Sequence, residues 1–199
     1  VWIMGYHVIV AGNIGAGKTT VAKAIEKHME FDFFQESVTD NPYLKPFYKD
    51  MKKYSYDLQM FFLSTRTVDH TRAMFAKKSC VQDRCVYEDA HIFAKNLNEK
   101  GFMSNEEFTK YKMFYDDRIE RLKQPDLMIY LHAEVPTLQR RIKLRGNKFE
   151  EDLIKPENPY LGQLQDVYVK GYEEYPGHKM KINTEEIDAK QDESKLIHI

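Results

Sequence analysis

The segment from Gly12 to Thr19 constrains the fold more than any other part of the chain. It reads Gly-Asn-Ile-Gly-Ala-Gly-Lys-Thr and fits the phosphate-loop pattern Gly-x-x-x-x-Gly-Lys-[Ser/Thr]. Its glycines let the backbone turn tightly and present N–H groups to an anion. Lys18 can reach the β- and γ-phosphates of a nucleotide, and the Thr19 hydroxyl can ligate a bridging Mg²⁺. The predicted phosphate-binding residues are Gly12, Asn13, Ile14, Gly15, Ala16, Gly17, Lys18, Thr19 and Thr20.

The flanking sequence supports this interpretation. Residues 6–11 form a short run rich in β-formers, and residues 20–27 have the spacing of a helix. A strand, a loop and a helix N-terminus directed at phosphates is the geometry that the motif requires. We therefore predict a nucleoside triphosphate site that works with Mg²⁺.

Length and composition favour one ordinary enzyme domain. The chain has 199 residues, of which 42% are hydrophobic, so residues 1–199 are expected to build a single core. Its net charge of −1 provides no basic field for nucleic acid. Cys80 and Cys85 lack Cys-x-x-Cys spacing and are expected to be reduced thiols. No run approaches the about 20 apolar residues of a membrane span, and no signal-peptide pattern is present. These observations predict a cytoplasmic protein without nucleic-acid or membrane partners.

Apolar runs alternate with helical stretches, which predicts an α/β fold. The expected strands cover residues 6–11, 31–36, 79–83, 127–131 and 179–183. The expected helices cover 20–27, a region from 41, then 54–75, 87–97, 106–122, 135–145 and 160–175, with a loop at 146–159 and a frayed final helix in the tail. Strands joined by helices indicate a parallel five-stranded sheet flanked by helices.

Three strand ends should meet at one edge of this sheet, because ligands bind beyond the carboxyl ends of parallel strands. They carry the loop at Gly12, then Glu36, then Asp83 and Arg84. In phosphoryl transfer, one carboxylate can hold Mg²⁺ or its waters, and another can accept the proton of an attacking hydroxyl. For either acid alone, a solvated charge at a strand end is an equally good interpretation.

Arg141 and Arg145 are four residues apart and should project from one face of a helix. Two guanidinium groups aimed at one point repel unless an anion lies between them. A lid that closes over a triphosphate would supply that anion and exclude water. The alternative is a solvated basic face paired with Glu150, Glu151 and Asp152.

Four segments in this order resemble the deoxynucleoside kinases, in particular the bacterial or phage deoxyadenosine, deoxyguanosine and deoxycytidine group. Besides the phosphate loop, they are Asn41-Pro42-Tyr43-Leu44 with Tyr48-x5-Tyr54-Ser55-Tyr56-x2-Gln59, Asp83-Arg84-Cys85-Val86-Tyr87-Glu88-Asp89-x3-Phe93, and Arg141-x3-Arg145-Gly146. The resemblance implies a P-loop kinase fold with an arginine-bearing lid at about residues 141–156. It also implies a homodimer formed through helices that flank the substrate site.

The activity implied by this resemblance is transfer of the γ-phosphate of ATP to the 5′-hydroxyl of a deoxynucleoside, with deoxyadenosine, deoxyguanosine or deoxycytidine favoured over thymidine. The implied catalytic residues are Lys18, Glu36, Arg84, Arg141 and Arg145, with both lid arginines also on ATP. Glu36 would be the general base, and Arg84 would orient the 5′-oxygen and the phosphoryl group. Thr19 and Asp83 would hold Mg²⁺, Asp83 through water.

The resemblance also implies a set of substrate contacts. The substrate-binding residues would be Glu36, Tyr48, Gln59, Phe62, Arg66, Arg84, Asp89, Phe93 and Glu150. Tyr48 and Glu150 would bind the 3′-hydroxyl, and Phe93 would stack on the base. Gln59 would pair with the base edge, since an amide carries both a donor and an acceptor. Arg66 and Asp89 would form a charged pair that selects against thymine.

Three positions depart from the family pattern. Cys85 replaces a serine, Asn147 replaces a further lid arginine, and Phe62 is bulkier than in some members, which leaves the base preference open. The sequence also leaves the preferred phosphate donor open. A nucleoside monophosphate kinase of the thymidylate type is the main alternative, but it needs more acceptor arginines and no general base. A GTPase-type switch or a non-catalytic nucleotide-binding module is more remote. The chain lacks Asn-Lys-x-Asp, and a non-catalytic module would leave the lid arginines without a task.

Overall fold

A parallel sheet forms the centre of the molecule, as expected. The computed structural model describes residues 5–35 and 41–185. Its strands are β1 (His7–Gly12), β2 (Asp32–Phe34), β3 (Cys80–Asp83), β4 (Leu127–His132) and β5 (Lys179–Asn183), in the order β2-β3-β1-β4-β5. All four pairings are parallel. Every residue of β1 is buried, which fits its central place and its apolar sequence.

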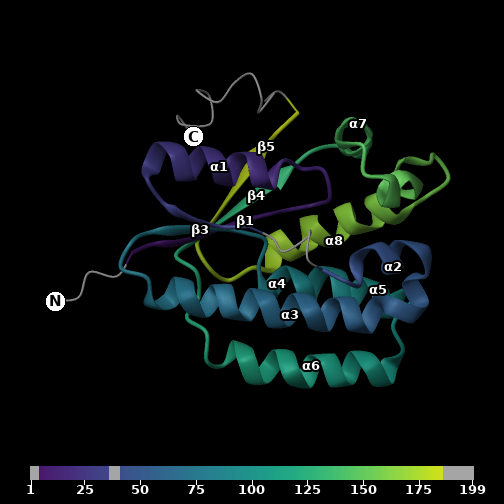
Figure 1. The fold of residues 1–199 in the computed structure, drawn as a ribbon, viewed down its shortest axis with the longest axis horizontal. Coiled ribbons are helices and arrows are strands. Elements are labelled where there is room, and N and C mark those ends of the chain that lie inside the picture. Colours follow the sequence, from purple (N-terminus) through teal and green to yellow (C-terminus); the bar gives the residue numbers. More distant parts are fainter. Residues whose placement is uncertain (1–4, 36–40, 186–199) are drawn as a thin grey trace.

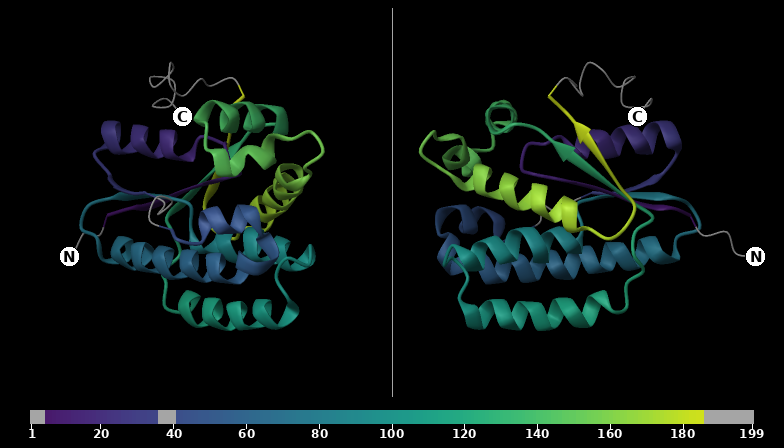
Figure 2. Two further views of the ribbon diagram at one scale, coloured as in Figure 1. Left: turned by 45° about the vertical axis from the view of Figure 1, so that its right-hand side comes forward. Right: turned by 180° about the vertical axis from the view of Figure 1, so that it is seen from behind.

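Helices cover both faces of this sheet. Helix α1 (Lys18–Met29) lies on one face, and the long α3 (Met51–Phe75) runs along the other, with α6 (Asn105–Ile119) outside it (Figures 1 and 2). Helices α2 (Leu44–Lys49), α7 (Val135–Arg145) and α8 (Tyr160–Glu174) lie around the carboxyl end of the sheet (Figure 1). None of the helices within the described ranges is long and apolar enough to cross a membrane.

The helix expected at residues 87–97 consists of three parts. An α-helical start, α4 (Val86–Glu88), leads into a π-helical segment, η1 (Asp89–Ala94), and then into α5 (Lys95–Glu99). A π turn carries one more residue than an α turn, and such turns are frequent at functional sites. Two predicted substrate residues, Asp89 and Phe93, lie on this segment. Because a π turn is wider, the angle between the Asp89 and Phe93 side chains around the helix axis differs from that in an α-helix.

Other boundaries differ from the expected ones. Strand β2 covers only residues 32–34 of the predicted 31–36, and Glu36 lies outside the described residues. The predicted loop at 146–159 contains a short 3₁₀ helix, η2 (Lys148–Ile154). The frayed helix expected in the tail falls within residues 186–199, which are also outside the described part.

Candidate active site

The loop after β1 has the backbone that a phosphate cradle needs. Gly12 has φ +152°, and a Cβ there would lie 2.7 Å from the carbonyl oxygen of Leu131. Gly15 has φ +82°, and its Cβ would lie 2.9 Å from the carbonyl oxygen of Leu138 on α7. Side chains at either position would therefore push the loop off β4 or α7. Lys18 is buried, and its Nζ donates to the carbonyl oxygens of Gly12 at 2.9 Å and Asn13 at 3.0 Å.

The two predicted metal-binding residues are in contact. Thr19 Oγ1 donates to Asp83 Oδ2 at 2.5 Å, so a hydroxyl and a carboxylate meet where β3 ends beside α1. Hard oxygen donors of this kind suit Mg²⁺, which keeps several waters and binds the nucleotide phosphates. The described residues contain no cluster of three or more His, Cys, Asp or Glu side chains that could hold a metal by themselves. The pair therefore fits an ion that arrives with a triphosphate.

A cavity of about 120 Å³ opens beside the loop. Thirteen predicted site residues line it, namely Ile14, Gly15, Lys18, Thr19, Tyr48, Gln59, Phe62, Arg66, Arg84, Asp89, Phe93, Arg145 and Glu150. They come from α1, α2, α3, the π segment and the lid region, so the fold assembles them from distant parts of the chain. The cavity lining does not include Gly12, Asn13, Ala16, Gly17, Thr20, Asp83 or Arg141.

At one end of the cavity a buried ion pair joins α3 to the π segment. Arg66 pairs with Asp89, and both side chains are almost completely buried. The Arg66 guanidinium lies 4.1 Å from the centre of the Phe62 ring. Nearby, Gln59 is buried, and its Oε1 finds no hydrogen-bond partner among the described residues. An unsatisfied amide oxygen in a cavity wall can accept a hydrogen bond from the amino group of a base.

Arg84 lies between this end and the phosphate loop. Its backbone has φ +69°, one of two positive values among non-glycine residues in the described chain. Its guanidinium stacks 4.5 Å from the centre of the Phe93 ring and donates from Nη1 to the Tyr168 hydroxyl at 3.1 Å. The ring and hydroxyl contacts therefore fix the Arg84 guanidinium, and the left-handed backbone fixes the direction in which the side chain leaves the chain.

The opposite end of the cavity is polar. Arg145 Nη2 lies 2.8 Å from the Glu150 carboxylate, and Asn147 Nδ2 donates to the same carboxylate at 3.0 Å. Tyr48 packs against Phe149 with ring centres 5.7 Å apart. Burial raises the pKa of Tyr48 well above its usual value, so its hydroxyl stays protonated and can donate.

The structure does not bring Arg141 and Arg145 to one point. Arg141 donates to the carbonyl oxygen of Thr184 at 2.6 Å and to its Oγ1 at 2.9 Å, and it also donates to the carbonyl oxygen of Ala16 in the phosphate loop at 3.3 Å. Only Arg145 reaches the cavity, where Glu150 is its partner. Both arginines lie on α7, but each guanidinium forms hydrogen bonds with different protein oxygens. Of the three acidic partners considered in the alternative, Glu150 is the one that pairs with Arg145 here, and its side chain is buried in the cavity wall rather than on a solvated face.

Several lining residues were not predicted, namely Leu44, Phe47, Leu58, Asn147 and Tyr160. The apolar ones carry no sequence signal that separates them from core. Glu88 was also passed over, although Cys85-x-x-Glu88 has the spacing of a capping box and forms one. The sulfur of Cys85 therefore preserves the local geometry that a serine would give. Burial raises the pKa of the Cys85 thiol, and of Cys80 to about 11.

Comparison with known proteins decides the family. The model of the family described as "Deoxynucleoside kinase" matches residues 8–198. The chain belongs to this family. It is therefore an ATP-dependent kinase of deoxynucleosides, which confirms the resemblance inferred from the motifs.

Individual relatives agree with this assignment. A deoxyadenosine/deoxycytidine kinase of Bacillus subtilis is 32% identical over 197 residues, covering 96% of this chain and 88% of the relative. A deoxyadenosine kinase of Dictyostelium discoideum is 37% identical over 164 residues, covering 82% of this chain and 65% of the relative. The solved structure of deoxyadenosine kinase from M. mycoides with bound dATP has a TM-score of 0.83 at 28% identity, covering 97% of both chains. The kinase described here thus shares its fold across almost its whole length.

Proposed function

We propose that this kinase phosphorylates the 5′-hydroxyl of deoxyadenosine, deoxyguanosine or deoxycytidine in preference to thymidine, with ATP and Mg²⁺. The observation that carries the base preference is the buried Arg66–Asp89 pair beside Gln59 in the cavity. Amino-bearing bases can satisfy these polar groups, whereas thymine would add a methyl group and leave them unpaired. Relatives named deoxyadenosine, deoxyadenosine/deoxycytidine and deoxyguanosine kinases support the same preference.

In the proposed reaction, each predicted catalytic residue has a separate role. Glu36 accepts the proton of the 5′-hydroxyl, and Arg84 orients the 5′-oxygen toward the phosphoryl group. Lys18 and the loop N–H groups hold the phosphates, and Thr19 and Asp83 would hold Mg²⁺, which would supply neutralising charge for the triphosphate. Arg141 and Arg145 close over the triphosphate after exchanging their present partners for phosphate oxygens.

A substrate panel tests the preference. The four deoxynucleosides and thymidine monophosphate are assayed with ATP and Mg²⁺, and kcat/KM is compared. We expect thymidine and its monophosphate to be the poorest acceptors. The Arg66→Met, Asp89→Ala double variant should shift the ratio toward thymidine, because both members of the buried pair leave together.

The control is Lys110→Met, Glu106→Ala, which removes an exposed ion pair on α6. It should leave the preference order unchanged. A wild-type enzyme that prefers thymidine contradicts the base preference. A double variant that folds but keeps the original order would make the Arg66–Asp89 pair structural and leave Phe62 as the next residue to test.

The role of Glu36 is tested by Glu36→Gln, which keeps size and hydrogen bonding but removes the proton acceptor. Loss of a general base typically costs about 10²–10⁴ in rate. Glu26→Gln on the exposed face of α1 serves as the control. A Glu36→Gln enzyme with near-wild-type kcat at neutral pH would show that another group takes the proton.

We also propose a cytoplasmic homodimer. The π segment and α8 border a second cavity of about 270 Å³, which extends inward to β4 and whose lining includes Ile92, Val167 and Tyr172. A second copy would cover this apolar surface. Val167→Glu should therefore yield monomers in light-scattering measurements, whereas Met113→Glu, on the exposed face of α6, should not. Dimers that persist in Val167→Glu and dissociate in Met113→Glu would move the interface to α6.

A further inference from the structure

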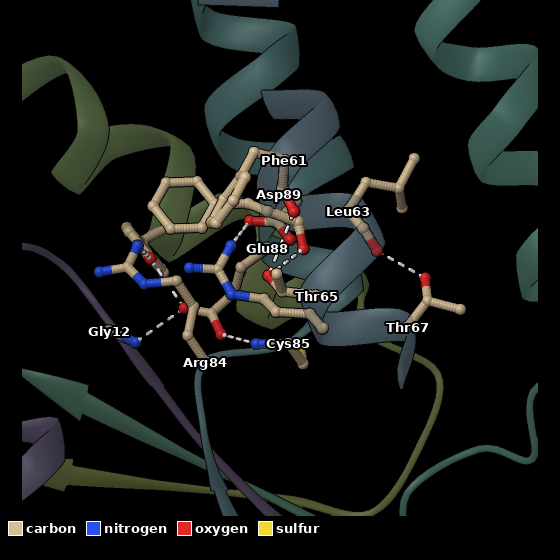
Figure 3. A network of polar contacts seen from close by, with 12 residues as sticks. Gly12, Phe61, Leu63, Thr65, Thr67, Arg84, Cys85, Glu88 and Asp89 are labelled. Carbon is tan, nitrogen blue, oxygen red and sulfur yellow. Dashed lines mark hydrogen bonds and ion pairs between the residues drawn. The ribbon is translucent and has the colours of Figure 1, made fainter. Parts of the chain in front are cut away.

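Glu88 occupies an unusual position between the phosphate loop and the helices below the sheet. Its side chain is only 3% exposed. Its Oε2 accepts the backbone N–H of Cys85 at 3.0 Å, and its Oε1 accepts the backbone N–H of Gly12 at 3.3 Å (Figure 3). Oε1 also accepts the hydroxyl of Tyr168 at 2.8 Å. One carboxylate therefore joins the first glycine of the loop, the residue after Arg84, and α8.

Tyr168 extends this chain of hydrogen bonds to the arginine. Its hydroxyl donates to Glu88 and accepts from Arg84 Nη1 at 3.1 Å, so it uses its single proton and one lone pair. The ring stacks on Tyr130 with centres 5.9 Å apart and meets Phe93 edge-on at 6.1 Å. With only 2% of the residue exposed, the hydroxyl has little freedom to move.

A capping box alone does not account for these contacts. The box at the start of α6 provides the comparison, since among the described residues the Glu107 carboxylate there accepts only from the backbone N–H and the hydroxyl of Ser104, and it is partly exposed. Capping at α4 uses only Oε2 of Glu88. The two contacts of Oε1 cross to β1 and to α8, and neither is needed to begin a helix.

We infer that Glu88 and Tyr168 are positioning residues that fix the phosphate loop and the Arg84 guanidinium relative to each other. Gly12 is the last residue of β1 and Arg84 directly follows the neighbouring β3, and hydrogen bonds to one carboxylate, direct or through Tyr168, position both. Donor phosphates and the arginine that orients the acceptor are thereby aligned together. Small misplacements matter at such a point, since a shift of about 1 Å can cost roughly a hundredfold in rate. The inference rests on the role proposed for Arg84.

The sharpest test is Tyr168→Phe, which keeps the ring and its packing but removes the hydroxyl. We expect kcat to fall about ten- to a hundredfold, while the KM for the deoxynucleoside and the melting temperature change little. Tyr172→Phe, one turn later on α8, is the control. The Tyr172 ring stacks on Tyr130 at 5.3 Å, and the change should leave kcat unchanged.

Glu88→Gln tests the other end of the chain. An amide cannot accept at both ends, so its NH₂ group must face the donor N–H of either Cys85 or Gly12. We expect a fall in kcat together with a rise in the KM for ATP, because the loop loses a fixed contact. Glu107→Gln is the matched capping-box control and should change neither. The Tyr168→Phe, Glu88→Gln double variant should be no slower than Glu88→Gln alone, since both act through one chain.

Arg84→Ala distinguishes a failure of the role proposed for Arg84 from a failure of the positioning inference. If it is slow while folded Tyr168→Phe retains wild-type kcat, Arg84 keeps its proposed role and the positioning inference is overturned, whether or not Glu88→Gln folds. If Arg84→Ala itself retains wild-type kcat, the proposed role of Arg84 fails, and the inference fails with it. A fall in kcat that follows the melting temperature across all variants would make the contacts structural only, and would also overturn the inference.

Discussion

The acceptor end and the donor end of the active site are organised differently. At the acceptor end, Arg66, Phe62 and Asp89 are fixed by an ion pair and a ring contact that belong to the buried core. At the donor end, Lys18 and Arg141 donate to backbone carbonyl oxygens, and Arg145 pairs with Glu150. If these cations bind the triphosphate as proposed, they exchange protein oxygens for phosphate oxygens during the reaction. The acceptor end should therefore contribute to stability, and the donor end to the rate of transfer.

The largest expected effect is on stability at the acceptor end. Asp89→Ala alone leaves the Arg66 charge buried without its carboxylate, which should cost about 3–5 kcal/mol in the free energy of unfolding. The Arg66→Met, Asp89→Ala double variant should lose clearly less. Urea denaturation measures both, with Glu106→Ala, which breaks an exposed ion pair on α6, as the control. A single variant within about 1 kcal/mol of wild type would contradict the assignment of this pair to the core.

At the donor end, Lys18→Met should affect transfer and spare the acceptor pocket. Removing one preorganised cation from a developing charge typically lowers kcat by about 10²–10³. The dissociation constant for the deoxynucleoside, measured by calorimetry, should stay near that of wild type. Lys23→Met on the exposed face of α1 should behave as wild type in both measurements. Equal losses in kcat and nucleoside affinity would mean that the two ends are not separable.

Arg145→Ala tests the boundary between the ends, because its partner Glu150 lines the same cavity as Tyr48. If Arg145 moves to the triphosphate, kcat should fall about tenfold with a smaller change in the deoxynucleoside KM. The exposed Arg140, on the same helix, gives the control Arg140→Ala. An unchanged kcat with a raised deoxynucleoside KM would assign Arg145 to the acceptor pocket.

The smallest expected effect lies where the strands begin, since His7, the first residue of β1, is buried there in edge-on contact with His70 of α3 at 4.6 Å. Burial, and then the neighbouring His70, lower the pKa of His7 to about 4, and burial lowers that of His70. The folded chain therefore prefers neutral rings, while the unfolded chain takes up protons below about pH 6.5. Stability should fall from that pH toward pH 4, by at most about 1.4 kcal/mol per pH unit and group.

Urea unfolding at pH 6.5 and pH 5 measures this slope, and His7→Gln should reduce it. The reaction rate of folded enzyme should not follow the same titration, because the histidines lie at the edge remote from the phosphate loop. An identical slope in wild type and variant would assign the acid sensitivity to other groups.

The sequence predicted the parallel sheet and the phosphate loop because both depend on local patterns. Strands β1 and β4 are continuous apolar runs, and the loop motif has a fixed spacing. The π segment could not be predicted, since its extra residue is accommodated by packing against α3 and α8 rather than by local propensity. The place of Tyr160 in the cavity lining also depends on long-range packing and could not be predicted from local sequence. The separation of Arg141 from Arg145 depends on Thr184 and Glu150, which lie far apart in the chain.

The two buried thiols have a practical consequence. Cys80 and Cys85 are both fully buried, and burial raises the pKa of each, so neither offers a thiolate to an alkylating reagent while the chain is folded. Cys85 follows Arg84 directly, within the network around Glu88. Its modification rate should therefore report how often this part of the enzyme opens. Iodoacetamide labelling followed by peptide mass spectrometry would time those openings, and deoxynucleoside with ATP should slow labelling at Cys85 more than at Cys80.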